Sequence, residues 1–153
     1  MKTNYLFPNA FKRIGWLLLL PSLLAGIVYL ILGEIEGPEW NVFAFWTEEL
    51  FGAQRYFVVV ENVVVDEFIA IGLLLGSVFV ALSKEKEEDE FIMRIRLESL
   101  VWALYWNYGV LLVAILFVYD MPFFWVMTVN MFSPLLLFVA RFRWKLKPVR
   151  DEE

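Results

Sequence analysis

Four long stretches without a charged residue limit the folds that this chain can adopt. They cover residues 14–33, 68–83, 99–119 and 121–140. A helix needs about 20 apolar residues to cross the roughly 30 Å hydrocarbon core of a bilayer, and all but the second stretch reach that length. A hydrophobic content of 61% and a mean hydropathy of +0.65 are too high for a soluble domain of 153 residues. The pattern therefore predicts four transmembrane helices.

The second stretch is the shortest, and the neighbouring valines extend it at its N-terminal end. A re-entrant segment is the alternative for this stretch. We expect one integral membrane domain over residues 1–153, in which the spans are connected by an outer loop, an inner loop and a basic inner tail. The expected spans are 14–33, 63–83, 99–119 and 121–140, the outer loop is 34–62, the inner loop is 84–98 and the tail is 141–153.

Basic residues are distributed unevenly among the connecting segments. All of them except Arg55 precede the first span, lie between the second and third spans, or follow the fourth. The positive-inside rule places these segments on the cytoplasmic side of the membrane. The expected fold is an all-α, polytopic four-helix transmembrane bundle, with both termini inside and a long, partly structured outer loop between the first two helices.

The residue types that are missing exclude several kinds of chemistry. The chain has no Cys and no His. Haem held by imidazole, thiolate-bound clusters, zinc sites with nitrogen or sulfur ligands and cysteine nucleophiles are therefore excluded for this chain alone. No predicted span contains a Lys that could form a Schiff base, and the acids near the spans lie at their ends. We expect no catalysis, no cofactor and no bound metal.

Small residues in the first two spans indicate close helix packing. Gly72 and Gly76 form a G-x-x-x-G motif, which lets two helix backbones approach each other in a membrane. Ser22 and Gly26 on the first span offer an opposing small surface. Packing within the chain is the first interpretation, and formation of a homodimer through the same face is the alternative.

The third and fourth spans are separated by Asp120 alone, which predicts a tight antiparallel hairpin. Asp120 is expected to cap the fourth helix, since its carboxylate can accept from free N–H groups at the helix start. Counted from this turn, Asn107 and Ser133 lie at equal depth and Asn130 lies about one turn away. We expect these side chains to hydrogen-bond across the hairpin, with about 0.6–2 kcal/mol from each bond.

The same polar residues offer an alternative function. A path for a small molecule or an ion would be lined by Asn107, Tyr108, Thr128 and Asn130. In that case the protein would act as a small-molecule carrier, which we rank third among the functions considered.

The outer loop is long enough to fold and is rich in aromatic residues. Residues 40–46 and 56–60 are short runs that favour strands or an interfacial position. The segment between them, residues 47–50, is typical of a helix start. The aromatic surface is expected to lie in the outer headgroups or to dock on another membrane subunit.

The inner loop combines acidic and basic residues beside an apolar stripe. The third helix is expected to begin within this loop and to project from the membrane. The loop is either a solvated helical extension or a docking site for a soluble partner. The candidate docking residues are Glu87, Asp89, Glu90, Arg94 and Arg96.

Three segments resemble a family of small, uncharacterised four-helix proteins of the bacterial inner membrane. The segments are FKRIGW at 11–16, SKEKEEDE at 83–90 and IRLESL at 95–100. Members of that family are often encoded beside a small helix-turn-helix transcriptional regulator. The resemblance therefore implies a multi-pass protein of the bacterial cytoplasmic membrane with such a regulator as its partner, and it implies no active site.

Two functions of different classes follow from these observations. The first is a non-catalytic regulatory protein that lies in the lipid bilayer and holds a cytoplasmic partner through residues 84–98. The alternative is an accessory subunit of a larger membrane complex, which docks through the outer loop and the Gly72/Gly76 face. Direct binding of nucleic acid is not expected from so short a basic tail beside the membrane.

Overall fold

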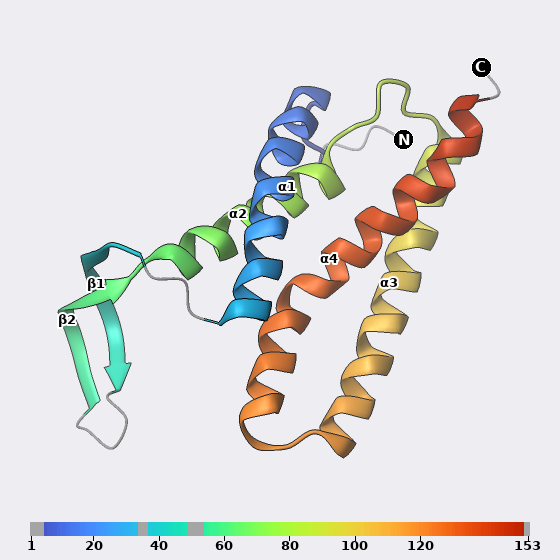
Figure 1. Cartoon of the computed structure of the whole chain (residues 1–153). Coiled ribbons are helices and arrows are strands. Elements are labelled where there is room, and N and C mark those ends of the chain that lie inside the picture. The colour runs from blue at the N-terminus through green and yellow to red at the C-terminus, as the bar shows by residue number, and fades with distance from the viewer. Residues whose placement is uncertain (1–4, 34–36, 49–53, 152–153) are drawn as a thin grey trace. The chain divides into compact units, whose positions relative to one another are not determined.

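The computed structural model describes residues 5–33, 37–48 and 54–151 (Figure 1). Its elements, in chain order, are α1 (Asn9–Leu32), β1 (Glu39–Glu48), β2 (Gln54–Val63), α2 (Val65–Leu82), α3 (Glu90–Phe117) and α4 (Asp120–Asp151). All four helices are long and apolar enough to cross a membrane. The chain is therefore mostly helical and is compatible with a multi-pass membrane protein, as the sequence predicts.

Contacts divide the chain into two units. The first consists of Met1–Leu19 together with Leu73–Glu153, and the second consists of Leu20–Gly72. The first unit contains the start of α1, most of α2 and all of α3 and α4. The second unit contains the rest of α1, both strands and the first turns of α2.

In the first unit, α3 and α4 run side by side in opposite directions (Figure 1). The buried residues of α3 recur every three or four positions and form one face of the helix, as expected for a packed helix. They are Ile92, Ile95, Ser99, Ala103, Asn107 and Ala114. α4 contributes Phe138, Phe142 and Leu146, which are also buried, and the rings of Phe138 and Phe142 stack with centroids 5.6 Å apart.

The start of α1 packs against the end of α2 through two glycines. A Cβ atom on Gly76 would lie 2.6 Å from the backbone nitrogen of Leu19, and one on Gly15 would lie 2.8 Å from the backbone nitrogen of Val80. Both distances are shorter than a van der Waals contact, so only glycine fits at these positions. The two backbones therefore touch directly, and Gly76 serves packing within this chain.

The residues before α1 are joined to the end of α2. The Phe7 N–H donates to the Leu82 carbonyl over 2.8 Å, and the Lys84 N–H donates to the Phe7 carbonyl over 2.9 Å. The side chain of Asn9 adds a 2.7 Å bond to the Lys84 carbonyl. The rings of Phe7 and Phe11 both pack on the ring of Phe79 at centroid distances of 5.4 Å.

In the second unit, β1 and β2 form an antiparallel hairpin, which corrects the all-α expectation. The register runs from Glu39 opposite Val63 to Glu48 opposite Gln54. The β-branched and aromatic residues of both runs favour this pairing, because their side chains pack across the strands. Phe57 has a φ of +56°, which is unusual for a bulky residue and interrupts the regular ladder between Val58 and Tyr56.

The hairpin also changes two boundaries. α2 begins at Val65 and not at position 63, because Val63 is the last residue of β2. Thr47 and Glu48 belong to β1 and not to a helix start, because they pair with Arg55 and Gln54 of β2. The remaining residues of the expected helix start, 49 and 50, lie outside the described residues.

α4 continues far beyond the end of the fourth apolar stretch. The expected basic tail from residue 141 is helical as far as Asp151, since one helix runs from Asp120 to Asp151. The α3 helix likewise begins at Glu90, well before its apolar stretch, as the sequence predicts. The charged parts of α3 and α4 thus continue the helical hairpin beyond its apolar stretches.

The two glycine environments predict opposite effects of alanine substitutions. Gly76→Ala should lower the free energy of unfolding by about 1–3 kcal/mol, because the added methyl group overlaps the Leu19 backbone. Gly109→Ala should be neutral or stabilising by up to about 1 kcal/mol, because nothing lies within 4 Å of its Cβ position. Thermal unfolding in mild detergent, followed by circular dichroism, measures both. Equal shifts would contradict the proposed close contact of α1 and α2.

Candidate functional site

Three ion pairs gather where the charged ends of α1, α3 and α4 meet the α2–α3 loop. Lys12 pairs with Glu85, Arg96 pairs with Glu88, and Lys145 pairs with Glu98. We call these six residues the charged collar. Its members come from α1, the α2–α3 loop, α3 and α4, so the collar joins segments that are distant in the sequence.

Arg96 makes the most contacts within the charged collar. Its Nη2 donates to both carboxylate oxygens of Glu88 over 2.9 and 3.0 Å, and its Nη1 donates to the carbonyls of Ala81 and Ser83 over 3.3 and 3.2 Å. Its guanidinium also lies 5.0 Å from the centroid of the buried Phe142 ring. The Arg96 and Glu88 side chains are only 12% and 14% exposed, so their bonds compete little with water.

The loop before α3 has a fixed conformation for local reasons. Asp89 is the N-cap of α3, and its carboxylate accepts from the Ile92 N–H over 2.8 Å. The Glu85 N–H donates to the Glu88 carboxylate over 2.9 Å, and the Glu85 carboxylate pairs with Lys12. Most of the acids in this run therefore hold the loop in place.

These contacts change the expected docking residues. Asp89 and Arg96 bind within the chain, whereas Glu87, Glu90 and Arg94 are exposed. Glu98, which follows Arg94 by one turn, bonds to Lys145 of α4 over 2.8 Å. The acidic cluster is therefore divided into structural acids and acids that remain available to a partner.

Two exposed apolar residues lie beside the available charges. Phe91 is 52% exposed and Leu97 is 63% exposed, although both lie on the part of α3 that precedes its apolar stretch. The sequence analysis did not single out these two residues, because it followed the apolar stripe that contains Ile92 and Ile95, which are buried. Phe91 and Leu97 lie outside that stripe, and this position could have indicated that they are exposed. We call Glu87, Glu90, Phe91, Arg94 and Leu97 the docking face.

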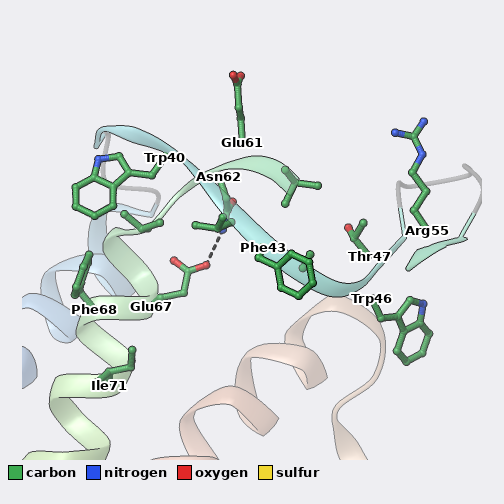
Figure 2. Close-up of a pocket in the computed structure, with 14 residues that line it drawn as sticks. Trp40, Phe43, Trp46, Thr47, Arg55, Glu61, Asn62, Glu67, Phe68 and Ile71 are labelled. Atoms are coloured by element: carbon green, nitrogen blue, oxygen red, sulfur yellow. Dashed lines mark hydrogen bonds between the residues drawn. The ribbon is translucent and has the colours of Figure 1, made fainter. Parts of the chain in front are cut away.

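The second unit contains a cleft between the hairpin and the first turns of α2 (Figure 2). Its volume is about 790 Å³. Trp40 and Phe68 close one end with an edge-to-face contact at 6.1 Å between centroids, and Ile71 lies below them. Asn62 donates to Glu67 over 2.6 Å, and this bond places the carboxylate at the wall of the cleft.

The hairpin also carries an uncovered apolar surface, which adjoins the cleft because Phe43 belongs to both. Phe43, Phe45 and Phe57 are each more than half exposed, and so is the neighbouring Val59. The rings contact one another, with 5.2 Å between the centroids of Phe43 and Phe45 and 5.5 Å between those of Phe45 and Phe57. We call these four residues the exposed aromatic face.

The polar residues of the α3–α4 hairpin are brought together only in part. The Asn130 side-chain N–H donates to the side-chain oxygen Oδ1 of Asn107 over 3.1 Å, across the two helices. Ser133 instead donates to the Val129 carbonyl of its own helix over 2.8 Å, and Thr128 likewise bonds to Phe124. A groove of about 570 Å³ passes Asn107, Asn130 and Ser133, but its remaining walls are mostly apolar.

The other expected packing and capping residues have the following positions. Gly72 is buried, whereas Ser22 and Gly26 are half-buried, and all three belong to the second unit. Asp120 is the first residue of α4 and has a φ of +59°, a conformation that Asp tolerates better than most residues. The turn before it is closed by the Val118 N–H, which donates to the Ala114 carbonyl over 2.8 Å.

Comparisons with known proteins do not assign a family or a function to this chain. No family model, no curated protein and no solved structure matches the chain. Among the described residues, no group of three or more His, Cys, Asp or Glu side chains is placed to hold a metal ion. Among the surfaces of the described residues are the docking face, the hairpin cleft, the exposed aromatic face and the groove at Asn107 and Asn130.

The charged collar predicts unequal effects of removing its acids. Glu88→Gln should lower the free energy of unfolding by about 1–3 kcal/mol, because it leaves the poorly exposed Arg96 without its carboxylate. Glu98→Gln should cost less than about 1 kcal/mol, because Glu98 and Lys145 are 53% and 36% exposed. Thermal unfolding in mild detergent compares the two variants. A larger loss of stability in Glu98→Gln than in Glu88→Gln would show that the Arg96–Glu88 pair is not the more stabilising of the two ion pairs.

Proposed function

We propose that this protein is a non-catalytic, multi-pass membrane protein that holds a soluble partner protein on its docking face. The observation that supports this best is the exposure of Phe91 and Leu97 on a helix that leaves the membrane. Apolar side chains in that position gain free energy when a partner removes them from water.

The charged collar supports the proposal because it makes the docking face rigid. Arg96 binds both the loop and the end of α2, and Asp89 fixes the first turn of α3. A surface that is already ordered loses less conformational entropy when a partner binds. The exposed charges Glu90 and Arg94 lie between the two apolar residues around α3, and the exposed Glu87 precedes the helix, so polar contacts are available beside the apolar ones.

The orientation of the protein belongs to the same proposal. The bases at this end of the helices favour a cytoplasmic position for both termini and for the docking face. The partner is then a cytoplasmic protein, and the family resemblance of residues 83–90 and 95–100 favours a helix-turn-helix regulator in a bacterial cell.

Substitution of the docking face tests this function. Phe91→Ser combined with Leu97→Ser should reduce recovery of the partner at least about tenfold, which corresponds to about 1.4 kcal/mol of binding free energy. The measurement is crosslinking in native membranes followed by affinity purification and mass spectrometry. In the wild-type protein, crosslinks should start from the exposed Lys84 and Lys86.

Trp144→Ser provides the matched control, because Trp144 is an exposed apolar residue of α4 outside the docking face. It should leave recovery of the partner unchanged. If both variants retain the partner equally, or if only integral membrane proteins are crosslinked, the docking function is wrong.

A second candidate is an accessory subunit of a membrane complex, and the exposed aromatic face of the hairpin favours it. Aromatic residues are enriched at the centre of protein interfaces, and these rings are already in contact with one another. Gly76 is a poor probe for this function, because it contacts Leu19 of its own chain. The hairpin is therefore the better place to test it.

Phe43→Ser combined with Phe45→Ser should release the protein from such a complex, because the variant removes two exposed rings from one face of β1. Co-migration in native gel electrophoresis measures the release. Tyr56→Ser is the control, because Tyr56 is also exposed but lies outside the exposed aromatic face. Unchanged migration of the double variant would argue against an accessory subunit.

A further inference from the structure

Arg141 differs from the bases of the charged collar in the partners that it has. Its guanidinium lies over the indole ring of Trp102, 4.3 Å from the centroid. Within the part of the chain that the structure describes, its Nε is buried and no hydrogen-bond acceptor reaches it, which is also true of the Nε of Arg96; the difference lies in the carboxylate partner. Lys12, Arg96 and Lys145, in contrast, are each paired with a carboxylate. Glu98 interacts with Arg141 through charge but makes its 2.8 Å hydrogen bond to Lys145, so an anion at Arg141 would supply a hydrogen-bonding partner.

The position of Arg141 along its helix indicates which anion is available. It is the first charged residue after the apolar stretch 121–140, and Glu98 is the last charged residue before the stretch 99–119. The Arg141–Trp102 pair therefore lies at the level of the lipid headgroups on whichever side of the membrane this end faces. Phospholipid phosphates are the most abundant anions at that level.

One face of α3 runs from this pair toward the middle of the apolar stretch 99–119. Trp102, Trp106, Gly109 and Val113 are spaced by four, three and four residues, so they lie along one face of the helix. The rings of Trp102 and Trp106 are in contact, with 5.9 Å between centroids. At 1.5 Å per residue the face is about 16 Å long, close to the thickness of one leaflet.

Gly109 makes the hollow in this face. A shallow groove of about 370 Å³ lies over it, between Trp106 and Val113. No atom lies within 4 Å of the position where a Cβ would be, so close packing within the described chain does not require glycine here. Glycine inside a helix costs about 1 kcal/mol relative to alanine. The hollow therefore leaves room for a group from outside the described chain.

We propose that Arg141 and Trp102 bind the phosphate of an anionic phospholipid, and that one acyl chain of this lipid lies in the groove over Gly109. A guanidinium can donate two parallel hydrogen bonds to a phosphate, and the indole beneath it holds its plane in place. Lys145, one turn further along α4, adds positive charge, although Glu98 offsets part of it. An anionic headgroup is therefore preferred over a zwitterionic one.

Native mass spectrometry of the full chain tests the proposal. The protein is purified in mild detergent, stripped of lipid, and titrated separately with phosphatidylglycerol and with phosphatidylcholine. The wild-type protein should bind one phosphatidylglycerol molecule at least about tenfold more tightly than phosphatidylcholine. Arg141→Gln should remove this preference and weaken binding of phosphatidylglycerol about tenfold.

Lys147→Gln is the matched control, because Lys147 is an exposed base of α4 beyond the ring contact. It should leave the affinity within about twofold of the wild-type value. Equal losses in Arg141→Gln and Lys147→Gln would mean that the basic helix attracts anionic lipid without a site, and would overturn the proposal. Circular dichroism shows whether each variant is folded, and Arg141→Lys, which keeps the charge, should retain more affinity than Arg141→Gln.

Gly109→Leu tests the acyl-chain groove. It should weaken phosphatidylglycerol binding at least about fivefold, because the leucine side chain fills the hollow. A second copy of the chain is the other occupant that could use this hollow. If the wild-type protein is a dimer, and Gly109→Leu makes it a monomer without changing lipid affinity, the groove is a helix contact and the proposal is wrong.

Discussion

Arg96 of α3 donates hydrogen bonds to carbonyl groups at the C-terminal end of α2. The arrangement of the charged collar depends on this contact. The last carbonyls of a helix have no partner within it, and α2 has no basic residue in its last turn. Arg96 donates to the carbonyls of Ala81 and Ser83 with one nitrogen and to Glu88 with the other. One side chain thereby satisfies a carbonyl of the last turn of α2 and ties that turn to the loop before α3.

The membrane helices were largely predictable from the sequence, because a charge inside a bilayer is costly and leaves a clear pattern. The hairpin was predictable only in part. The runs at 40–46 and 56–60 had the composition of strands, but their register depends on pairing between two separate segments. Thr47 and Glu48 look like a helix start when they are considered alone, and their pairing with Arg55 and Gln54 overrides that preference.

The charged segment shows why site residues are harder to predict than spans. The sequence singled out the acids of residues 84–98, but it could not show which of them already have partners. Glu85 follows α2 and binds Lys12, which lies near the start of α1. Glu98 of α3 binds Lys145 of α4. Those contacts are long-range, so no local pattern reports them. The exposed Phe91 and Leu97 were hidden for the same reason, since exposure depends on where α4 packs.

The pairing of Lys12 with Glu85 has a consequence for how the protein is made. Most of α1, both strands and the whole of α2 lie between the two residues in the sequence. Lys12 is therefore synthesised long before Glu85. At about 5–20 residues per second, the ribosome needs several seconds to reach position 85. The parallel contact of Phe7 with Ser83 has the same delay. Gly76 and Val80 of α2 are synthesised before Glu85, so the glycine contacts between α1 and α2 can form first, and the Lys12–Glu85 pair and the Phe7–Ser83 bridge can be added only afterwards.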